Sequence, residues 1–167
     1  IAHGSLFGSL GSTLRVSQGE MELSGKYHRE QIIKKAIEKS SIENKYDYIL
    51  FDCPPGMGIF ALNAIASADS LLIPCQCELL AMEGMGILFE LLEEPIENLN
   101  PDIDILGILP TRLDGRKALT GDAYEMLKMK YENVLEPIRE NVRLSELGID
   151  KKSVFEKNFL LKGANPE

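Results

Sequence analysis

A short apolar run that stops at an acid and two prolines constrains the fold of this chain more than any other feature. The segment from Tyr46 to Gly58 reads YDYILFDCPPGMG, and its apolar part, residues 48–51, ends at Asp52. A compact apolar run bounded in this way is typical of a strand buried on both faces, as in a parallel sheet. The sequence therefore predicts a strand over 48–51 with Asp52 at its carboxyl end.

Similar apolar runs recur along the chain, and sequence of helical character separates them. Further strands are predicted over 70–75, 103–110 and 134–138. Helices are predicted over 26–41, 59–68, 81–92 and 119–131. This alternation predicts an α/β fold with a doubly wound, mostly parallel sheet flanked by helices.

The start of the chain differs in composition from the rest. Residues 1–13 are rich in glycine and serine, and we expect an irregular lead-in there. Residues 14–167 are expected to form one domain, because a chain of 167 residues can bury a sizeable core. The first residue is an isoleucine, so we also expect the domain to be incomplete at its N-terminus.

Charge and composition narrow the class of protein. No apolar run approaches the roughly 18 residues of a membrane span, and an odd number of cysteines favours reduced thiols in a cytoplasm. The net charge of −8 argues against a nucleic-acid binder as a whole. Residues 78–104 contain eight acids and no Lys or Arg, whereas residues 139–162 contain six basic side chains against four acids. A basic C-terminal patch therefore stays possible.

Candidate site residues lie where the predicted strands end. In an open parallel sheet, ligands bind outside the carboxyl ends of the strands, here 52–58, 75–78, 111–116 and 139–146. Asp52 is placed to hold Mg²⁺ or, alternatively, to cap a turn. Pro54 and Pro55 have no N–H, so the first amide after Cys53 that can donate to a phosphate is that of Gly56.

Taken with four later segments, this motif resembles the ParA-type partitioning ATPases, within the larger group that includes MinD. The later segments are LNAIASADSLLIPCQCELLAMEG, LPTRLDGR, NVRLSE and Lys162-Gly163-Ala164, and the match covers about residues 14–164. The resemblance implies a P-loop NTPase-like fold whose central and C-terminal parts are present here. It also implies an ATPase with ATP and Mg²⁺ as cofactors.

The resemblance further implies partners and residue roles. The protein would form a homodimer with ATP, bind DNA without sequence preference and be stimulated by a ParB-like protein, in the cytoplasm at the nucleoid. The implied nucleotide-site residues are Asp52, which serves catalysis and holds Mg²⁺ through water, Pro54, Pro55 and Gly56 in the switch, and Thr111, Arg112 and Asn141 near the base. Arg143 and Lys162 fall in regions that face DNA in such proteins.

Two departures from the family pattern affect the expected activity. The phosphate-binding motif K-G-G-x-G-K-T is absent, and the nearest imitation, residues 8–13, has Ser12 in place of its lysine. We therefore expect the complete protein, but not this chain alone, to hydrolyse ATP. Arg139 also replaces a proline that often packs on adenine in the family.

Two other functions stay open. One is a MinD-like ATPase that cycles on a membrane, although residues 158–167 show no basic amphipathic helix and we expect no membrane partner. The other is a non-catalytic interaction module that has lost its P-loop.

Overall fold

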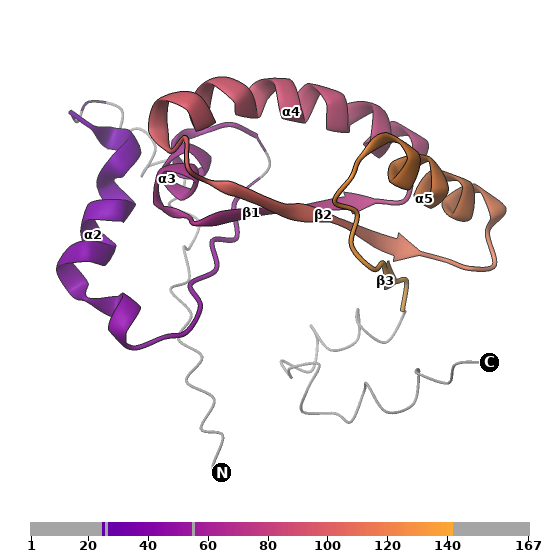
Figure 1. Cartoon of the computed structure of the whole chain (residues 1–167), viewed down its shortest axis with the longest axis horizontal. Helices are drawn as coiled ribbons and strands as arrows, with labels where there is room; N and C mark the ends of the chain where they lie inside the picture. Colours follow the sequence, from indigo (N-terminus) through magenta and orange to yellow (C-terminus); the bar gives the residue numbers. More distant parts are fainter. Residues whose placement is uncertain (1–24, 26, 55, 142–167) are drawn as a thin grey trace, which may run out of the picture. The chain divides into compact units, whose positions relative to one another are not determined.

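The computed structural model describes Gly25, residues 27–54 and residues 56–141. In chain order the elements are η1 (Arg29–Gln31), α2 (Ile32–Ser40), η2 (Ile42–Asn44), α3 (Ile59–Ser67), β1 (Ser70–Gln76), α4 (Leu79–Leu99), β2 (Asp104–Leu113), α5 (Ala118–Lys130) and β3 (Ile138–Arg139), where η marks a 3₁₀ helix (Figure 1). The chain divides into two compact units. Of the described residues, the first unit contains those up to Leu71 and residues 86–106, and the second contains residues 72–85 and 107–141.

The strands form a sheet in the order β1-β2-β3. The Asp104 amide donates to the Asp69 carbonyl where β1 and β2 begin, and the Cys77 amide donates to the Thr111 carbonyl where they end. These two strands therefore run in the same direction. β2 and β3 are also parallel, with Thr111 opposite Ile138. The predicted parallel sheet with helices in its connections is confirmed.

In the first unit, one buried asparagine joins two helical segments. The side chain of Asn63, in α3, is 1% exposed. Its Nδ2 donates to the carbonyls of Arg29 at 2.7 Å and Ile59 at 2.8 Å, and its Oδ1 accepts from the Ile33 amide at 3.0 Å. The Ile33 amide lies in the first turn of α2, where amides have no partner within their own helix. Asn63 thus supplies the cap that no residue of α2 provides.

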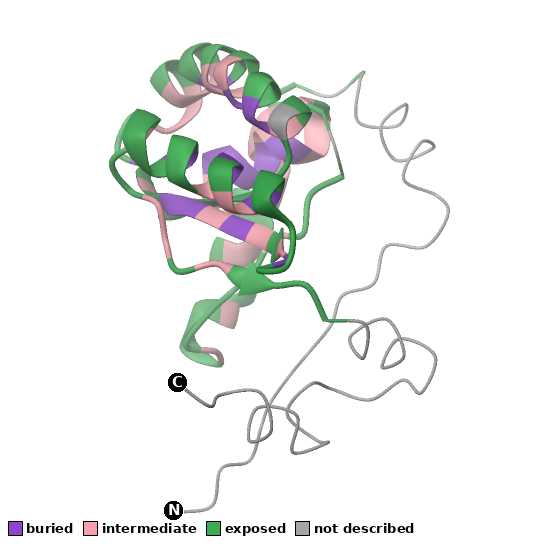
Figure 2. Ribbon diagram, turned by 90° about the vertical axis from the view of Figure 1, so that its right-hand side faces the viewer, coloured by how far each residue is buried: buried purple, intermediate pink, exposed green. Residues whose placement is uncertain are grey.

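In the second unit, burial alternates along the strands. Ile73 and Cys75 of β1 are buried, while Leu72, Pro74 and Gln76 are exposed, and Figure 2 shows this mixture of colours in the strands. A period of two is what a sheet with one packed face produces. The other side chains of this unit's core include Cys77, Met82, Met85, Ile108, Pro110, Ala123 and Leu127.

Gly107, in β2, lies against the segment that leads to β3. The Ile108 amide donates to the Asn133 carbonyl at 2.7 Å, and the Leu135 amide donates back to the Ile108 carbonyl at 2.9 Å. Gly107 has φ of +151°, and a Cβ built on it would lie 2.8 Å from the Asn133 carbonyl oxygen. Only glycine allows this backbone conformation and this close approach.

The predicted strand over 48–51 is wrong, because the structure has irregular backbone there. Tyr48 and Leu50 are 85% and 90% exposed. An apolar run becomes a strand only when a neighbouring strand supplies ladder hydrogen bonds, and no strand among the described residues pairs with this segment. The strands predicted over 70–75 and 103–110 and the helices are confirmed to within a few residues, except at the end of α4. The strand predicted over 134–138 is largely wrong, because β3 contains only residues 138 and 139 and Val134 forms an isolated bridge with Ile108. The lead-in over residues 1–13 lies outside the described residues.

Helix α4 continues seven residues beyond its predicted end at Leu92 and includes Pro95. Proline in a helix interior has no amide to donate, which normally favours an end to the helix. Here Ile96 and Leu99 are half-buried in the last turns, and their apolar contacts offset the lost hydrogen bond. The helices of the described part of the chain include none that is long and apolar enough to cross a membrane.

Candidate nucleotide and strand-end site

The segment from Asp52 to Gly58, in the first unit, leads directly into α3. Asp52, Cys53, Pro54 and Gly56 are exposed, and Pro55 lies outside the described residues. Gly56 has φ of +104°, a conformation that favours glycine, and Gly58 is the N-cap residue of α3. Because the first amides of a helix point outward, this segment can present backbone donors to an anion.

Asp52 is available as a ligand for a cation. Its carboxylate forms no ion pair or hydrogen bond with any residue in the described ranges, and the side chain is exposed at the point where the apolar run ends. An exposed carboxylate without a protein partner among the described residues can help to hold Mg²⁺. These residues therefore fit one half of a site for Mg²⁺ and a nucleoside phosphate.

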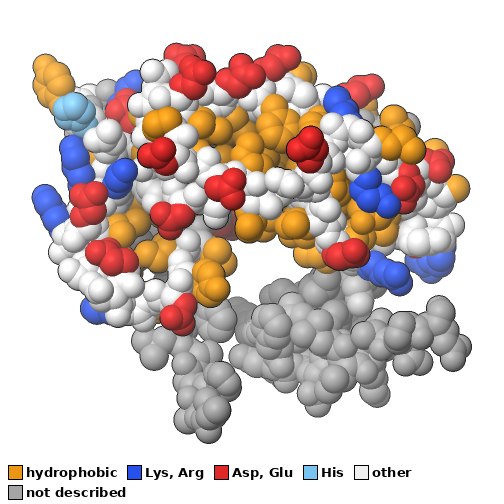
Figure 3. All heavy atoms as spheres, viewed as in Figure 1, with side chains coloured by type: hydrophobic (Ala, Val, Ile, Leu, Met, Phe, Trp, Pro, Cys, Tyr) orange, Lys and Arg blue, Asp and Glu red, His pale blue; other side chains and the backbone are white. Residues whose placement is uncertain are grey.

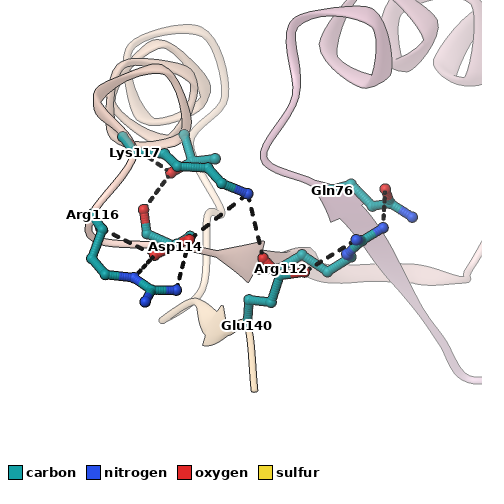
Figure 4. Close-up of polar contacts among 7 residues, drawn as sticks. Gln76, Arg112, Asp114, Arg116, Lys117 and Glu140 are labelled. Carbon is teal, nitrogen blue, oxygen red and sulfur yellow. Dashed lines mark hydrogen bonds and ion pairs between the residues drawn. The ribbon is translucent and has the colours of Figure 1, made fainter. Parts of the chain in front are cut away.

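In the second unit, the carboxyl ends of the three strands bring charged side chains together. The strand-end cluster consists of Gln76, Arg112, Asp114, Arg116, Lys117 and Glu140 (Figure 4). Arg112 donates to Gln76 Oε1 at 3.4 Å and to Glu140 Oε1 at 3.1 Å. Lys117 Nζ lies 3.7 Å from Glu140 Oε2. Glu140 thus links the end of β3 to the end of β2 and to the start of α5.

Two of the predicted base-site residues lie in this region. Thr111 donates from Oγ1 to the Cys75 carbonyl at 3.4 Å. Arg112 has φ of +57°, a left-handed conformation that costs energy for a residue other than glycine. Asn141 directly follows Glu140 and is exposed. Thr111 and Arg112 therefore lie at the end of β2, and Asn141 lies just after β3, the strand paired with it. Arg143 and Lys162 lie outside the described residues.

The turn between β2 and α5 is organised by Asp114, which is buried. Arg116 donates to both carboxylate oxygens of Asp114, from Nε at 3.0 Å and from Nη2 at 3.2 Å, and its backbone amide donates at 3.1 Å. Thr120 Oγ1 donates to the Asp114 carbonyl at 2.7 Å. The hydrogen bonds from the Arg116 side chain, and then that from its amide, lower the pKa of Asp114.

This geometry predicts a stability difference that depends on pH. Because the pKa of Asp114 is lowered by folding, its contribution is present at neutral pH and is lost as the pH falls below about 4. We expect Asp114→Asn to lower the urea midpoint at pH 7, and we expect the difference from the unsubstituted protein to shrink as the pH falls below about 4. Asp122→Asn, at an exposed position of α5, is the control and should leave the midpoint unchanged at both pH values. An equal loss at both pH values for Asp114→Asn would refute the role of its charge.

The cysteines do not form a metal site in the described part of the chain. Cys75 and Cys77 are buried, Cys53 is exposed, and all three are free thiols. Burial raises the pKa of Cys75 and of Cys77, so both thiols stay protonated near neutral pH. No group of three or more His, Cys, Asp or Glu side chains among residues 27–54 and 56–141 is arranged to hold a metal ion.

Asp114 and Glu140 are the site residues that the sequence did not single out. Their roles depend on the pairing of β2 with β3 and on the turn before α5, neither of which a local pattern reveals. One local signal was present for Asp114, because Asp-Gly followed by a basic residue is typical of a turn closed by an aspartate side chain.

The sequence of this chain is similar to those of known proteins. The AAA domain family profile matches residues 7–105, which is more than half of the chain. The sporulation initiation inhibitor protein Soj of Bacillus subtilis is 37% identical over 137 residues, covering 81% of this chain and 53% of Soj. The chromosome partitioning protein ParA of Myxococcus xanthus is 39% identical over 137 residues, covering 81% of this chain and 48% of ParA. The chain thus spans about half the length of these curated relatives.

Solved structures with a similar fold include proteins with bound nucleotide. Cobyrinic acid a,c-diamide synthase from Mycobacterium smegmatis with bound ADP and magnesium is 30% identical, with a TM-score of 0.70 over 78% of this chain and 53% of that one. Apo McdA from Cyanothece is 22% identical, with a TM-score of 0.68 over 86% of this chain and 58% of that one, and this likeness concerns the fold alone.

Proposed function

Because this chain belongs to the AAA domain family, and within it to the ParA-type P-loop ATPases, we propose that the protein is a chromosome or plasmid partitioning ATPase. Residues 14–167 would form the central and C-terminal part of its ATPase domain. The observation that carries the proposal is the exposed Asp52, which has no ion pair with any residue that the structure describes, at the start of a segment that runs into the N-terminus of α3. The relative from Myxococcus xanthus, which is 39% identical to this chain, is a chromosome partitioning protein.

ATP and Mg²⁺ are the cofactors that suit these residues. Asp52 would hold Mg²⁺ through a water molecule, and bound Mg²⁺ would neutralise part of the phosphate charge. Pro54 and Pro55 stiffen the segment, so that the Gly56 amide is the first that can report on a phosphate. No side chain in this segment is a nucleophile with a base beside it, so the chain's contribution to catalysis would be positioning and electrostatic stabilisation.

The residues at the ends of β2 and β3 would contact the adenine base of ATP. Thr111 and Arg112 lie at the end of β2, and Asn141 follows β3 on the chain. A planar guanidinium can stack on a base, and Arg112 is held in place by Gln76 and Glu140. The assembled protein would be a cytoplasmic, nucleoid-associated homodimer that binds DNA without sequence preference through Arg143 and Lys162, with a ParB-like partner that stimulates hydrolysis.

The test is an ATPase assay on the full-length protein with and without Mg²⁺. We expect slow hydrolysis that depends on Mg²⁺ and falls about 30- to 100-fold in Asp52→Asn, because the variant loses a carboxylate that serves the metal. Asp47→Asn is the matched control, since it removes another exposed acid five residues earlier and should retain full turnover.

Three outcomes would contradict parts of the proposal. Full turnover in Asp52→Asn would refute the role of that carboxylate. A full-length protein that binds no ATP would favour the non-catalytic interaction module instead. Binding to DNA that is unaffected by ATP, or by a rise in salt from 50 to 200 mM, would refute a dimer that holds DNA through its phosphates.

A further inference from the structure

The middle of α4 carries an exposed ridge of aliphatic side chains with carboxylates along one side. Ile87 and Leu91 are 61% and 53% exposed, and Glu90 and Glu94 are exposed beside them. We propose that these four residues, the α4 ridge, form a docking surface for a basic amphipathic helix of a partner protein. The proposal goes beyond the ATPase function, since it needs neither nucleotide nor DNA.

The spacing of the ridge places its members on one face of the helix. Each of the positions 87, 90, 91 and 94 lies three or four residues from two others of the set, and such positions are neighbours on a helix surface. Leu92, which is 6% exposed, points toward the packed side of the same helix. The ridge is therefore a second apolar stripe, in addition to the one that α4 buries. Single exposed aliphatic residues are common, but a pair four residues apart is the pattern by which helices pack.

The charge around the ridge specifies the chemistry of its partner. The sequence contains no Lys or Arg from Tyr46 to Thr111. The carboxylates of Glu90 and Glu94 form no ion pair with any residue that the structure describes. Figure 3 shows acidic side chains gathered along α4, at the top of that view, with hydrophobic surface beside them. A helix with aliphatic residues on one face and Lys or Arg along its flank matches both features.

A second copy of this chain suits the ridge less well. Pairing two α4 ridges would bring Glu90 and Glu94 of one copy close to the same acids of the other. Like charges at close range oppose association, and this cost would act against only two aliphatic side chains per copy. A basic partner converts the same carboxylates into attractive groups.

The test uses a fluorescent peptide of about 18 residues with leucines at helical spacing and lysines along one flank, titrated with the protein in the absence of nucleotide. We expect a Kd on the order of tens of micromolar at low salt, weakened by added salt. Glu94→Lys should weaken binding about fivefold or more, because it replaces attraction by repulsion beside the ridge. Glu93→Lys is the matched control, with the same change in net charge one residue away, and should stay within about twofold, since successive helical residues are turned by about 100°.

Several results would overturn the proposal, provided that circular dichroism shows both variants to be folded. One is the absence of binding to the lysine peptide. Others are equal weakening by Glu94→Lys and Glu93→Lys, and equal affinity for a peptide with glutamates in place of the lysines. Self-association that disappears in Ile87→Ser would assign the ridge to a second copy instead. If a peptide with serines in place of its leucines binds more weakly than the lysine peptide, the result would support the proposed docking of an amphipathic helix. None of these outcomes bears on ATP hydrolysis, so a failure here is distinct from a failure of the proposed ATPase.

Discussion

Replacing Gly107 by alanine is expected to destabilise the protein by about 3–5 kcal/mol. The alanine Cβ would lie 2.8 Å from the Asn133 carbonyl oxygen and 3.0 Å from Leu135 Cγ, at a backbone φ of +151° that alanine does not adopt without strain. The first neighbour is backbone that is itself held by the hydrogen bond from the Ile108 amide. Relief would require β2 to separate from the segment that leads to β3.

The measurement is urea denaturation followed by circular dichroism, with Gly121→Ala as the matched control. Gly121 lies within α5, and a Cβ on it would meet nothing within 4 Å. The same chemical change should there stabilise the protein by about 0.5–1 kcal/mol, because alanine favours the helix. If Gly107→Ala unfolds at the same urea concentration as the unsubstituted protein, the close approach at Gly107 is not a constraint on the fold.

Replacing Asn63 by alanine is expected to cost about 2–4 kcal/mol. The side chain is 1% exposed and forms three hydrogen bonds with backbone groups of Arg29, Ile33 and Ile59. Removing it takes a partner from each of these groups in a place that water does not reach freely. Asn63→Asp should be at least as harmful, since a carboxylate cannot donate to the two carbonyls and its charge would be buried.

Asn98→Ala serves as the control for Asn63. Asn98 lies on the exposed side of α4, and within the described part of the chain its side chain forms one hydrogen bond, from Nδ2 to the Glu94 carbonyl at 2.9 Å. Its loss should change the free energy of unfolding by less than about 0.5 kcal/mol, because water replaces the bond and alanine favours the helix. Similar losses for Asn63→Ala and Asn98→Ala would contradict the view that Asn63 joins α2 to α3.

Periodicity predicted most elements of this fold because their apolar spacing is local. The starts of α3 and β1 follow the expected boundaries, since glycine precedes α3 and a compact apolar run forms β1. The strand predicted over 48–51 failed for a non-local reason, because an apolar run acquires ladder hydrogen bonds only from a neighbouring strand. The length of α4 was underestimated because half-buried side chains beyond Pro95 compensate a local breaking signal.

The candidate site divides in the same way. Thr111 and Arg112 could be placed at a strand end from sequence, because the end of an apolar run is visible in the chain itself. The ion pairs of Glu140 with Arg112 and Lys117 could not, since they join residues on either side of α5. The role of Asn63 could not be predicted for a similar reason, because a polar residue inside an apolar helix does not indicate which distant backbone groups its side chain bonds.

The pairing of β2 with β3 also has a consequence for how the chain folds. Its contacts join Ile108 to Val134 and Thr111 to Ile138, which are separated along the chain only by α5 and its two connections. Closing so short a loop costs little conformational entropy, and a low contact order is associated with rapid folding. The β2–α5–β3 segment therefore acquires its strand pairing from contacts that are close along the chain.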